Sequence, residues 1–437
     1  MNYFFLPAKK EIDHNANLLA YFAMLVYILS LFSKFIPVVT NSMIGCIFAV
    51  ALYNTRNGFF SGIKKNTAIL GIIIFYMLQI FSMLLSENVS EGFKILSNTV
   101  PFILFGFAFC FIEFQQKTWH RILHFFALAT TGASIFSFFV SVAEVLRTQD
   151  SGYLYNDNLC FIIGKQAVYF SLYVSISIII FIFLLQQDTY QKKIKGWIYL
   201  AISWLFIILF LLASKAAMLG LIAILAIYLG TTLIQHKKYM EICILVLSLG
   251  IGSVLLVKIF PKTLNRFKGS TETKFRFDNV NAENHFNAEF DENKWTSSSM
   301  RAAIWTCATE VWKEHFIFGT QIGDKHAALQ KKYEEKHFWY AIAYQKNTHS
   351  QYLDILISMG LIGFLIFMCC YFLYPLWHFI KHKQIFAIMI FTLTGICLIT
   401  ETMFARYQGI VLLALLLPLA SKIGPKKSDP LPGSQNL

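Results

Sequence analysis

The sequence predicts an all-α polytopic membrane protein with about twelve transmembrane helices. Of its 437 residues, 57% are hydrophobic, 16% aromatic and only 14% charged, and the mean hydropathy is +0.57; these values lie outside the range of soluble domains. The apolar runs are long and continuous, whereas membrane β-strands would be about ten residues of alternating character. Since a bilayer core of roughly 30 Å requires about 20 apolar residues per helix, the runs predict membrane-spanning helices.

The predicted helices divide the chain into four parts. Nine fall within residues 1–258, a long polar segment follows at 259–350, three more fall within 351–421, and residues 422–437 are predicted to be a disordered cytoplasmic tail. In chain order the apolar runs lie near 18–35, 37–54, 68–86, 95–114, 121–146, 166–186, 195–213, 216–234, 240–258, 351–380, 385–403 and 408–421.

The basic residues predict the orientation of this bundle, because Lys and Arg in short loops tend to stay on the cytoplasmic side. Both termini are then cytoplasmic, and loops 87–94, 147–165, 259–350 and 404–407 lie on the opposite, outer side of the membrane. Most of the net charge of +13 is explained by topology, so nucleic-acid binding is not predicted. The residues on the predicted cytoplasmic side are Lys9, Lys10, Arg56, Lys64, Lys65, Lys117, Arg121, Lys192, Lys193, Lys195, Lys237, Lys238, Lys381, Lys383, Lys422, Lys426 and Lys427.

The first apolar run is predicted to remain as an anchor. Residues 1–16 are polar, and no small-residue cleavage site follows the run. Six of the eight cysteines lie inside apolar runs, which leaves Cys160 and Cys307 on the outer side. No disulfide framework is implied, although one bond between these two could form.

The long outer segment is predicted to contain an irregular part and a helical part. Residues 269–296 are rich in Asn, Asp, Glu and Phe without a period. From Ser297 onward apolar residues recur at helical spacing, with the serines as a plausible N-cap. Arg301 then lies in the first turns of an amphipathic helix that ends around 318–319. The sequence 319–324 reads as a turn before a second helix at about 324–340.

A histidine at the end of this segment is the first candidate for chemistry. His349 precedes an apolar run long enough to cross a bilayer, so a titratable base lies at a membrane surface. A neutral imidazole is well suited to take a proton from an alcohol near neutral pH. The chain is therefore predicted to be a membrane enzyme.

Several spaced motifs resemble one family. Arg301-x-x-x-Trp305, the turn Gly319-x-x-x-Gly323, His349 with Tyr352, and Gly360-x-x-Gly363 occur in an order similar to the closing block of the O-antigen ligase and polymerase superfamily. The last outer turn, with Glu401, Arg406 and Gly409, is also similar. The resemblance covers roughly residues 200–420.

The chain departs from the family pattern at three positions. Ser350 stands where Asn is usual, and Ser358 where an acidic residue is usual. The family's Ser-Arg-Gly at the start of a membrane helix is Ser214-Lys215-Ala216 here. Lys keeps the charge but lacks the bidentate guanidinium fork, which changes how a phosphate can be held.

The resemblance implies an inverting glycosyltransferase that takes a glycan from undecaprenyl pyrophosphate and passes it to a hydroxyl of lipid A–core. Such a reaction requires a base for the acceptor and fixed positive charge for the departing pyrophosphate, and it requires no cofactor. His349 is the predicted base, and Arg301, Lys215 and Lys165 are the predicted pyrophosphate-binding cations. No metal is predicted, because the sequence lacks His-Glu-x-x-His, Cys-x-x-Cys and Asp-x-Asp patterns.

Each remaining candidate has a structural alternative. Lys215 could be a snorkelling lysine, and Arg406 and Glu401 could form a structural ion pair instead of contacting an acceptor. Trp305 and Tyr352 could be packing or interfacial anchors. Glycines in this block, namely Gly319, Gly323, Gly360 and Gly363, would form the turn and allow close helix packing.

Three other functions use the same features. A polymerase that joins repeat units, and a transferase that places glycan on protein hydroxyls, require the same base and cations. A transporter of a lipid-linked saccharide would bind phosphate through Arg301 and Lys215 without any reaction. Weak internal symmetry and a large one-sided loop argue against the transporter.

Overall fold

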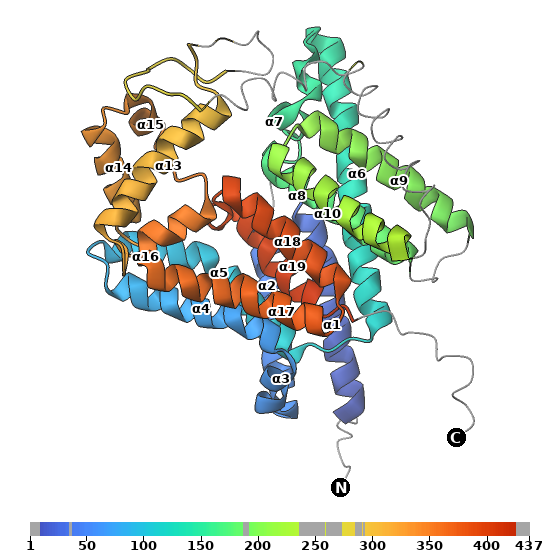
Figure 1. Ribbon diagram of the computed structural model, residues 1–437. Helices are drawn as coiled ribbons and strands as arrows, with labels where there is room; N and C mark the ends of the chain where they lie inside the picture. The colour runs from blue at the N-terminus through green and yellow to red at the C-terminus, as the bar shows by residue number, and fades with distance from the viewer. Residues whose placement is uncertain are drawn as a thin grey trace.

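The computed structural model describes residues 9–34, 37–186, 192–235, 258, 273–284, 291 and 293–424. Within these residues the protein is all-α (Figure 1), and the only β-type pairing there is an isolated bridge between Glu283 and Trp295. The fold class predicted from the hydropathy is therefore confirmed.

The N-terminal part consists mainly of long apolar helices, with two short helices, α3 and α7, between them. They are α1 (Lys9–Ser30), α2 (Pro37–Asn54), α3 (Phe59–Lys65), α4 (Thr67–Leu84), α5 (Val89–Phe111), α6 (Gln116–Thr148), α7 (Asn156–Leu159), α8 (Ala167–Leu185), α9 (Lys192–Leu212) and α10 (Lys215–Gln235). The first helix begins at Lys9 and ends at Ser30, so the predicted bounds of 18–35 were wrong: the polar residues 9–17 extend the helix beyond the apolar run.

The C-terminal part contains three helices of the polar segment that precedes residue 351, followed by the last apolar helices. They are α13 (Ser297–Glu314), α14 (Lys325–Glu335), α15 (Trp339–Ala343), α16 (Gln351–Met368), the π-helical turn η3 (Cys369–Leu373), α17 (Tyr374–Lys381), α18 (Ile385–Thr400) and α19 (Tyr407–Ser421).

Seven helices of the described residues are long and apolar enough to cross a membrane, and four shorter apolar helices accompany them. These eleven correspond to eleven of the predicted stretches. The remaining stretch, 240–258, lies outside the described residues except for Lys258, so the full number of spans stays a prediction.

Hydrogen bonds between turns define the two ends of the bundle. At one end the Asn54 amide bonds Asn17 and the Phe111 carbonyl, and the Lys422 ammonium bonds Asn66. The start of α1 and the end of α19 therefore lie at the same end, together with the basic turn that contains Arg56. Figure 1 shows the helices α13, α14 and α15 at the opposite end. We refer to the end with these three helices as the outer end.

Helices α13, α14 and α15, which we call the lid, have a small core of their own. Trp295, Ile304, Tyr333 and Phe338 are buried together in it. A capping box begins α13: the Thr296 side chain accepts from the Ser299 backbone, and the Ser299 hydroxyl accepts from Thr296. The N-cap is therefore Thr296, one residue before the predicted serines.

Two predicted helices are interrupted in the structure. The predicted helix 324–340 ends at Glu335, because His337 adopts a left-handed conformation (φ 56°) before α15 begins. The predicted helix 351–380 is bent at Gly360 (φ 62°) and contains the π-helical turn η3. Neither break was predicted from the apolar period.

The bend at Gly360 attaches the lid to the membrane helices. The backbone N–H groups of Leu361 and Ile362 donate to the carbonyls of Phe316 and Ile317, at 2.9 and 3.2 Å, and Thr320 donates to Ile357 at 2.8 Å. A Cβ at Gly319 would lie 2.5 Å from the Gly360 nitrogen. The two glycines thus allow backbone to meet backbone, and the turn after α13 is held on the kinked α16.

The disulfide considered between Cys160 and Cys307 does not form. Both thiols are free and buried. Cys160 donates to the Lys165 carbonyl in the helix bundle, whereas Cys307 belongs to the lid core. The two residues therefore lie in separate hydrophobic clusters.

Candidate active site

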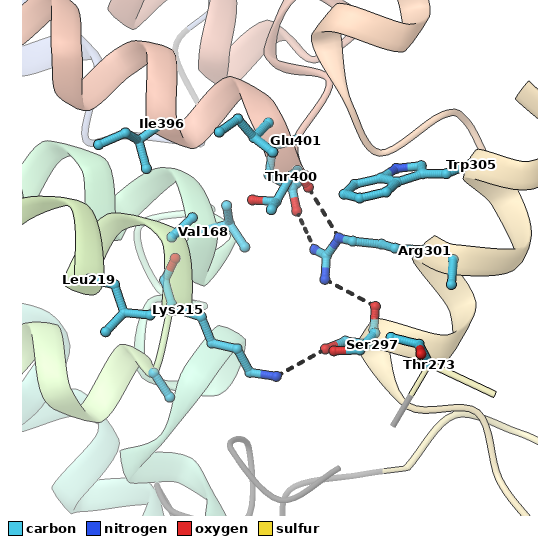
Figure 2. A pocket seen from close by; sticks show the side chains of 16 residues that line it. Val168, Lys215, Leu219, Thr273, Ser297, Arg301, Trp305, Ile396, Thr400 and Glu401 are labelled. Carbon is cyan, nitrogen blue, oxygen red and sulfur yellow. Dashed lines mark hydrogen bonds and ion pairs between the residues drawn. The ribbon is translucent and has the colours of Figure 1, made fainter. Parts of the chain in front are cut away.

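A cavity of about 550 Å³ lies where the lid meets helices α10 and α18 (Figure 2). Lys215, Ser297, Arg301 and Glu401 supply its charged and polar surface. We call it the amphipathic cavity, since the rest of its wall is largely apolar, with Val168, Leu219, Trp305, Ile396 and Ile399 among the lining residues.

Arg301 is fixed from three directions. Its guanidinium donates to the Thr400 carbonyl (3.2 Å) and the Ser297 carbonyl (3.2 Å), and it forms an ion pair with Glu401 at 3.0 Å. Thr400 and Glu401 lie where α18 ends, and Ser297 is one turn before Arg301 on α13. Because Thr400 and Glu401 are 99 and 100 residues from Arg301 in sequence, the guanidinium orientation depends on docking of the lid.

Lys215 reaches the same cavity from the opposite wall (Figure 2). It is the first residue of α10, and its ammonium donates to the Ser297 hydroxyl at 3.3 Å. Ala213 has a positive φ of 51°, which makes the tight turn from α9. This turn places the lysine at the outer end of a helix, where the sequence offered only a short gap between apolar runs.

His349 lies between the lid and α16 in a strained turn. Its φ is 45°, and its backbone N–H donates to the Asn347 side chain at 3.1 Å. Burial first, and then the positive charge of neighbouring cations, lower the pKa of the imidazole from 6.5 to about 3. Those cations are Arg301, Lys346 and Arg406. The imidazole is therefore neutral at physiological pH, and it lies within electrostatic reach of Arg301.

Glu401 is the carboxylate of the site. Burial raises its pKa, while Arg301 and Arg406 oppose that shift. It forms an ion pair with Arg301, whereas the sequence had suggested a pair with Arg406. Arg406 instead lines a second cavity, together with Lys94 and Asn98 of α5.

Lys165 does not line the amphipathic cavity. Its side chain is only 9% exposed, and its ammonium lies 5.5 Å from the centre of the Tyr173 ring. Burial lowers the pKa of this lysine to about 8. The structure therefore separates Lys165 from Arg301 and Lys215, with which the sequence had grouped it, because the turn 164–166 is attached to Gln408 instead.

The aromatic candidates have structural partners. The Trp305 indole N–H donates to the Thr348 carbonyl at 3.0 Å, next to His349, while its ring lines the amphipathic cavity. The Tyr352 hydroxyl donates to the Gly395 carbonyl at 2.8 Å. The Tyr352 ring packs against phenylalanine rings. Gly319 and Gly323 belong to the lid turn, where Gly323 N–H donates to Ser86.

Some residues of the site were not predicted. The carbonyl of Thr400 and both oxygens of Ser297 hold the two cations, and Asn347 holds the His349 backbone. Every residue has a backbone carbonyl, so the sequence does not indicate which carbonyl will bind a cation. Asn347 could have been noticed as a turn former two residues before the histidine.

Residues 198–368 match the family model described as O-antigen ligase. The match includes Lys215, Arg301, Trp305, Gly319 and His349, and it ends where α16 ends. No curated protein matches the chain. The resemblance to the O-antigen ligase and polymerase superfamily is thereby confirmed for these residues, and the apolar helices together with this match indicate a membrane protein.

Proposed function

We propose that this protein is a metal-independent, inverting glycosyltransferase of the O-antigen ligase type. It transfers a glycan from undecaprenyl pyrophosphate to a hydroxyl of lipid A–core at the periplasmic face of the inner membrane. The observation that supports this most directly is the amphipathic cavity, which combines two cations with apolar walls and whose Arg301 acts electrostatically on the neutral His349.

The cavity suits a ligand that is both anionic and lipid-like. Lys215 and Arg301 face one carboxylate, Glu401, so the local charge balance is positive and favours a pyrophosphate. Leu219 and Ile399 of the wall are 56% and 47% exposed, so the apolar wall continues to the outer surface of the bundle. A polyprenyl chain could enter along this wall while its pyrophosphate contacts the cations.

His349 has the properties of a base that depends on the donor. In the free protein its low pKa makes it a weak proton acceptor. A bound pyrophosphate would oppose the positive charge of Arg301, which is the second cause of the shift after burial, and would raise the pKa. The imidazole would therefore be a stronger base when the donor is present.

The reaction balances with these groups alone. The acceptor oxygen forms a bond to the anomeric carbon as the bond from that carbon to the phosphate oxygen breaks. The acceptor proton passes to His349, and the electron pair of the broken bond remains on undecaprenyl pyrophosphate, stabilised by Arg301 and Lys215. Attack from the face opposite the leaving group inverts the anomeric centre.

Deletion of the gene in its host, followed by complementation, tests the proposal. Wild type should restore long-chain glycan on lipid A–core, and His349→Asn should not; Asn is chosen because it tolerates a positive φ. We expect at least about a hundredfold loss of transfer by purified His349→Asn. The matched control is His315→Asn, since His315 is an exposed lid histidine at the end of α13.

The surface glycolipid gel, with a blot for glycoproteins, separates the rival functions. Loss of long glycan from lipid A–core with polymerised glycan left on its carrier supports ligase activity. Single carrier-linked repeats would mean a polymerase, and a changed glycoprotein profile a protein transferase. Full rescue by His349→Asn would refute the catalytic role of the histidine.

A further inference from the structure

Three successive apolar side chains of the lid are exposed. Phe316, Ile317 and Phe318 form the turn that follows α13, and we call them the lid tip. A run of this kind is unfavourable in water, because each side chain leaves a large apolar area in contact with solvent. An apolar partner that covers the lid tip would remove this cost.

The lid tip lies where two membrane helices reach the outer end. Ser82, in the last turn of α4, donates to the Gln321 side chain at 2.8 Å. The Leu361 N–H of α16 donates to the Phe316 carbonyl at 2.9 Å. Residues 361–381 alone provide about the 20 residues that cross a bilayer core, so the lid tip lies where this crossing begins. Figure 1 shows the end of α13 beside the outer ends of α4 and α16.

The exposed apolar surface of these two helices continues onto the lid tip. Phe81 and Leu84 are exposed at the end of α4, and Ile362 and Leu365 are exposed on α16 directly after the bend. Both helices are long and apolar enough to cross a membrane, so acyl chains cover the apolar side chains that they expose. The bilayer is therefore the partner that already meets this surface.

The backbone of the lid tip also suits an apolar environment. In lipid, backbone polar groups need partners within the protein, because no water can replace them. Each of the three carbonyls of the lid tip accepts a hydrogen bond. The donors are the N–H groups of Leu361 and Ile362 for Phe316 and Ile317, and the Gln321 side-chain amide for Phe318. This non-helical turn can therefore enter lipid without leaving these carbonyls unpaired.

The residues that precede the lid tip are typical of a membrane interface. The Trp312 indole N–H donates to the Phe316 carbonyl at 3.3 Å, and the two rings pack together at 5.0 Å between their centres. Lys313 is exposed beside them. Tryptophan and lysine are common at headgroup level, where one end meets lipid and the other water. Lysine is depleted in protein–protein interfaces, so this arrangement favours a lipid surface over a second protein.

We infer that the lid tip inserts into the leaflet at the outer end and anchors the lid there by contact with phospholipid acyl chains. The lid is then held at two places: Arg301 binds the end of α18, and the lid tip binds the bilayer. The inference concerns a membrane contact and does not depend on glycan transfer.

Photo-cross-linking from three positions tests the anchor. p-Benzoylphenylalanine is introduced at Phe318, Leu365 or Tyr344, which are 65%, 53% and 63% exposed. Full-length protein is placed in vesicles of phosphatidylethanolamine and phosphatidylglycerol with tritiated acyl chains. Leu365 is the lipid-facing reference on α16. Tyr344 is the matched aromatic control, because it ends α15 on the side of the lid away from α4 and α16 (Figure 1).

Lipid label at Phe318 should be within about twofold of that at Leu365 and at least about fivefold above that at Tyr344, as for side chains buried in the interface. Label at Phe318 no higher than at Tyr344 would mean that water covers the lid tip, and would overturn the anchor. A cross-linked band at twice the mass of the chain would assign the surface to a second copy and would also overturn it. The probe at Ile317 is a second reporter: strong lipid label there supports the anchor even where the Phe318 variant does not fold.

Discussion

Two groups of charged residues at the outer end of the molecule are built from the same residue types and behave differently. In the lid, Lys332 pairs with Glu314 at 2.6 Å and Glu335 at 2.5 Å, and Lys336 pairs with Glu310 at 2.8 Å. Each cation there has its own carboxylate. The amphipathic cavity is lined by two cations, Lys215 and Arg301, and by one carboxylate, Glu401, which pairs with Arg301.

The difference lies in charge balance and in the surroundings. The carboxylates of the lid group are one-third to one-half exposed, so water screens them and the pairs contribute little to stability. Glu401 is only 14% exposed, and apolar side chains surround the cations of the cavity. We therefore expect the lid group to be structural and the cavity group to bind an anion. Four predictions test this contrast, from the largest expected effect to the smallest.

Arg301→Gln should produce the largest change. It removes the cation that is best aligned for a leaving pyrophosphate and leaves Glu401 buried without its partner. We expect kcat/KM for glycan transfer to fall about 10²–10³-fold, as for the loss of one electrostatic stabiliser. Steady-state kinetics with lipid-linked donor measure this. Activity close to wild type would place the pyrophosphate elsewhere and remove the contrast between the two groups.

Lys215 should show a smaller, charge-dependent effect. Lys215→Met is expected to raise the KM for the donor about tenfold, because one of two cations is lost. Lys215→Arg should stay within about threefold of wild type, since the charge remains. Titration of donor binding with inorganic pyrophosphate as competitor, at low and high salt, provides the measurement. Equal donor affinities of the two variants would indicate that the charge of Lys215 does not contribute to donor binding.

The pH dependence should reveal the donor's effect on His349. The base must be unprotonated, so activity falls as the pH drops through its pKa. In the free protein the pKa of His349 is about 3. Because kcat/KM reports the free enzyme, it should stay flat from pH 7.5 down to 5. The acid limb of kcat, which reports the complex, should lie at higher pH. Coincident limbs near pH 6.5 would contradict the link between the cations and the histidine.

Lys332→Gln should have the least effect on activity. The two glutamates that it leaves behind are about half exposed and can be rehydrated. We expect transfer rates within about twofold of wild type and a loss of at most about 1 kcal/mol of stability. Thermal unfolding in detergent together with the transfer assay checks both. A loss of activity as large as that of Arg301→Gln would mean that the lid group takes part in binding.

Particular residues show what could be predicted for the candidate site. Arg301 and His349 were found because they stand in spaced motifs next to an apolar run, and Lys215 because a cation was out of place for its side of the membrane. Lys165 was predicted on the same topological ground, yet it is buried near Tyr173. The predicted side of the membrane restricts the position of a residue only along the membrane normal. It therefore cannot predict which side chains surround that residue.

The sequence by itself determined the all-α class, the positions of most apolar helices and the resemblance to a family, because hydropathy and motif spacing are local properties. Only the tertiary structure decided the bend at Gly360, the pairing of Arg301 with Glu401, and the two cavities at the outer end. These features depend on backbone and side chains that are distant in the chain. Their energies come from contacts that exist only after the lid has packed on the membrane helices.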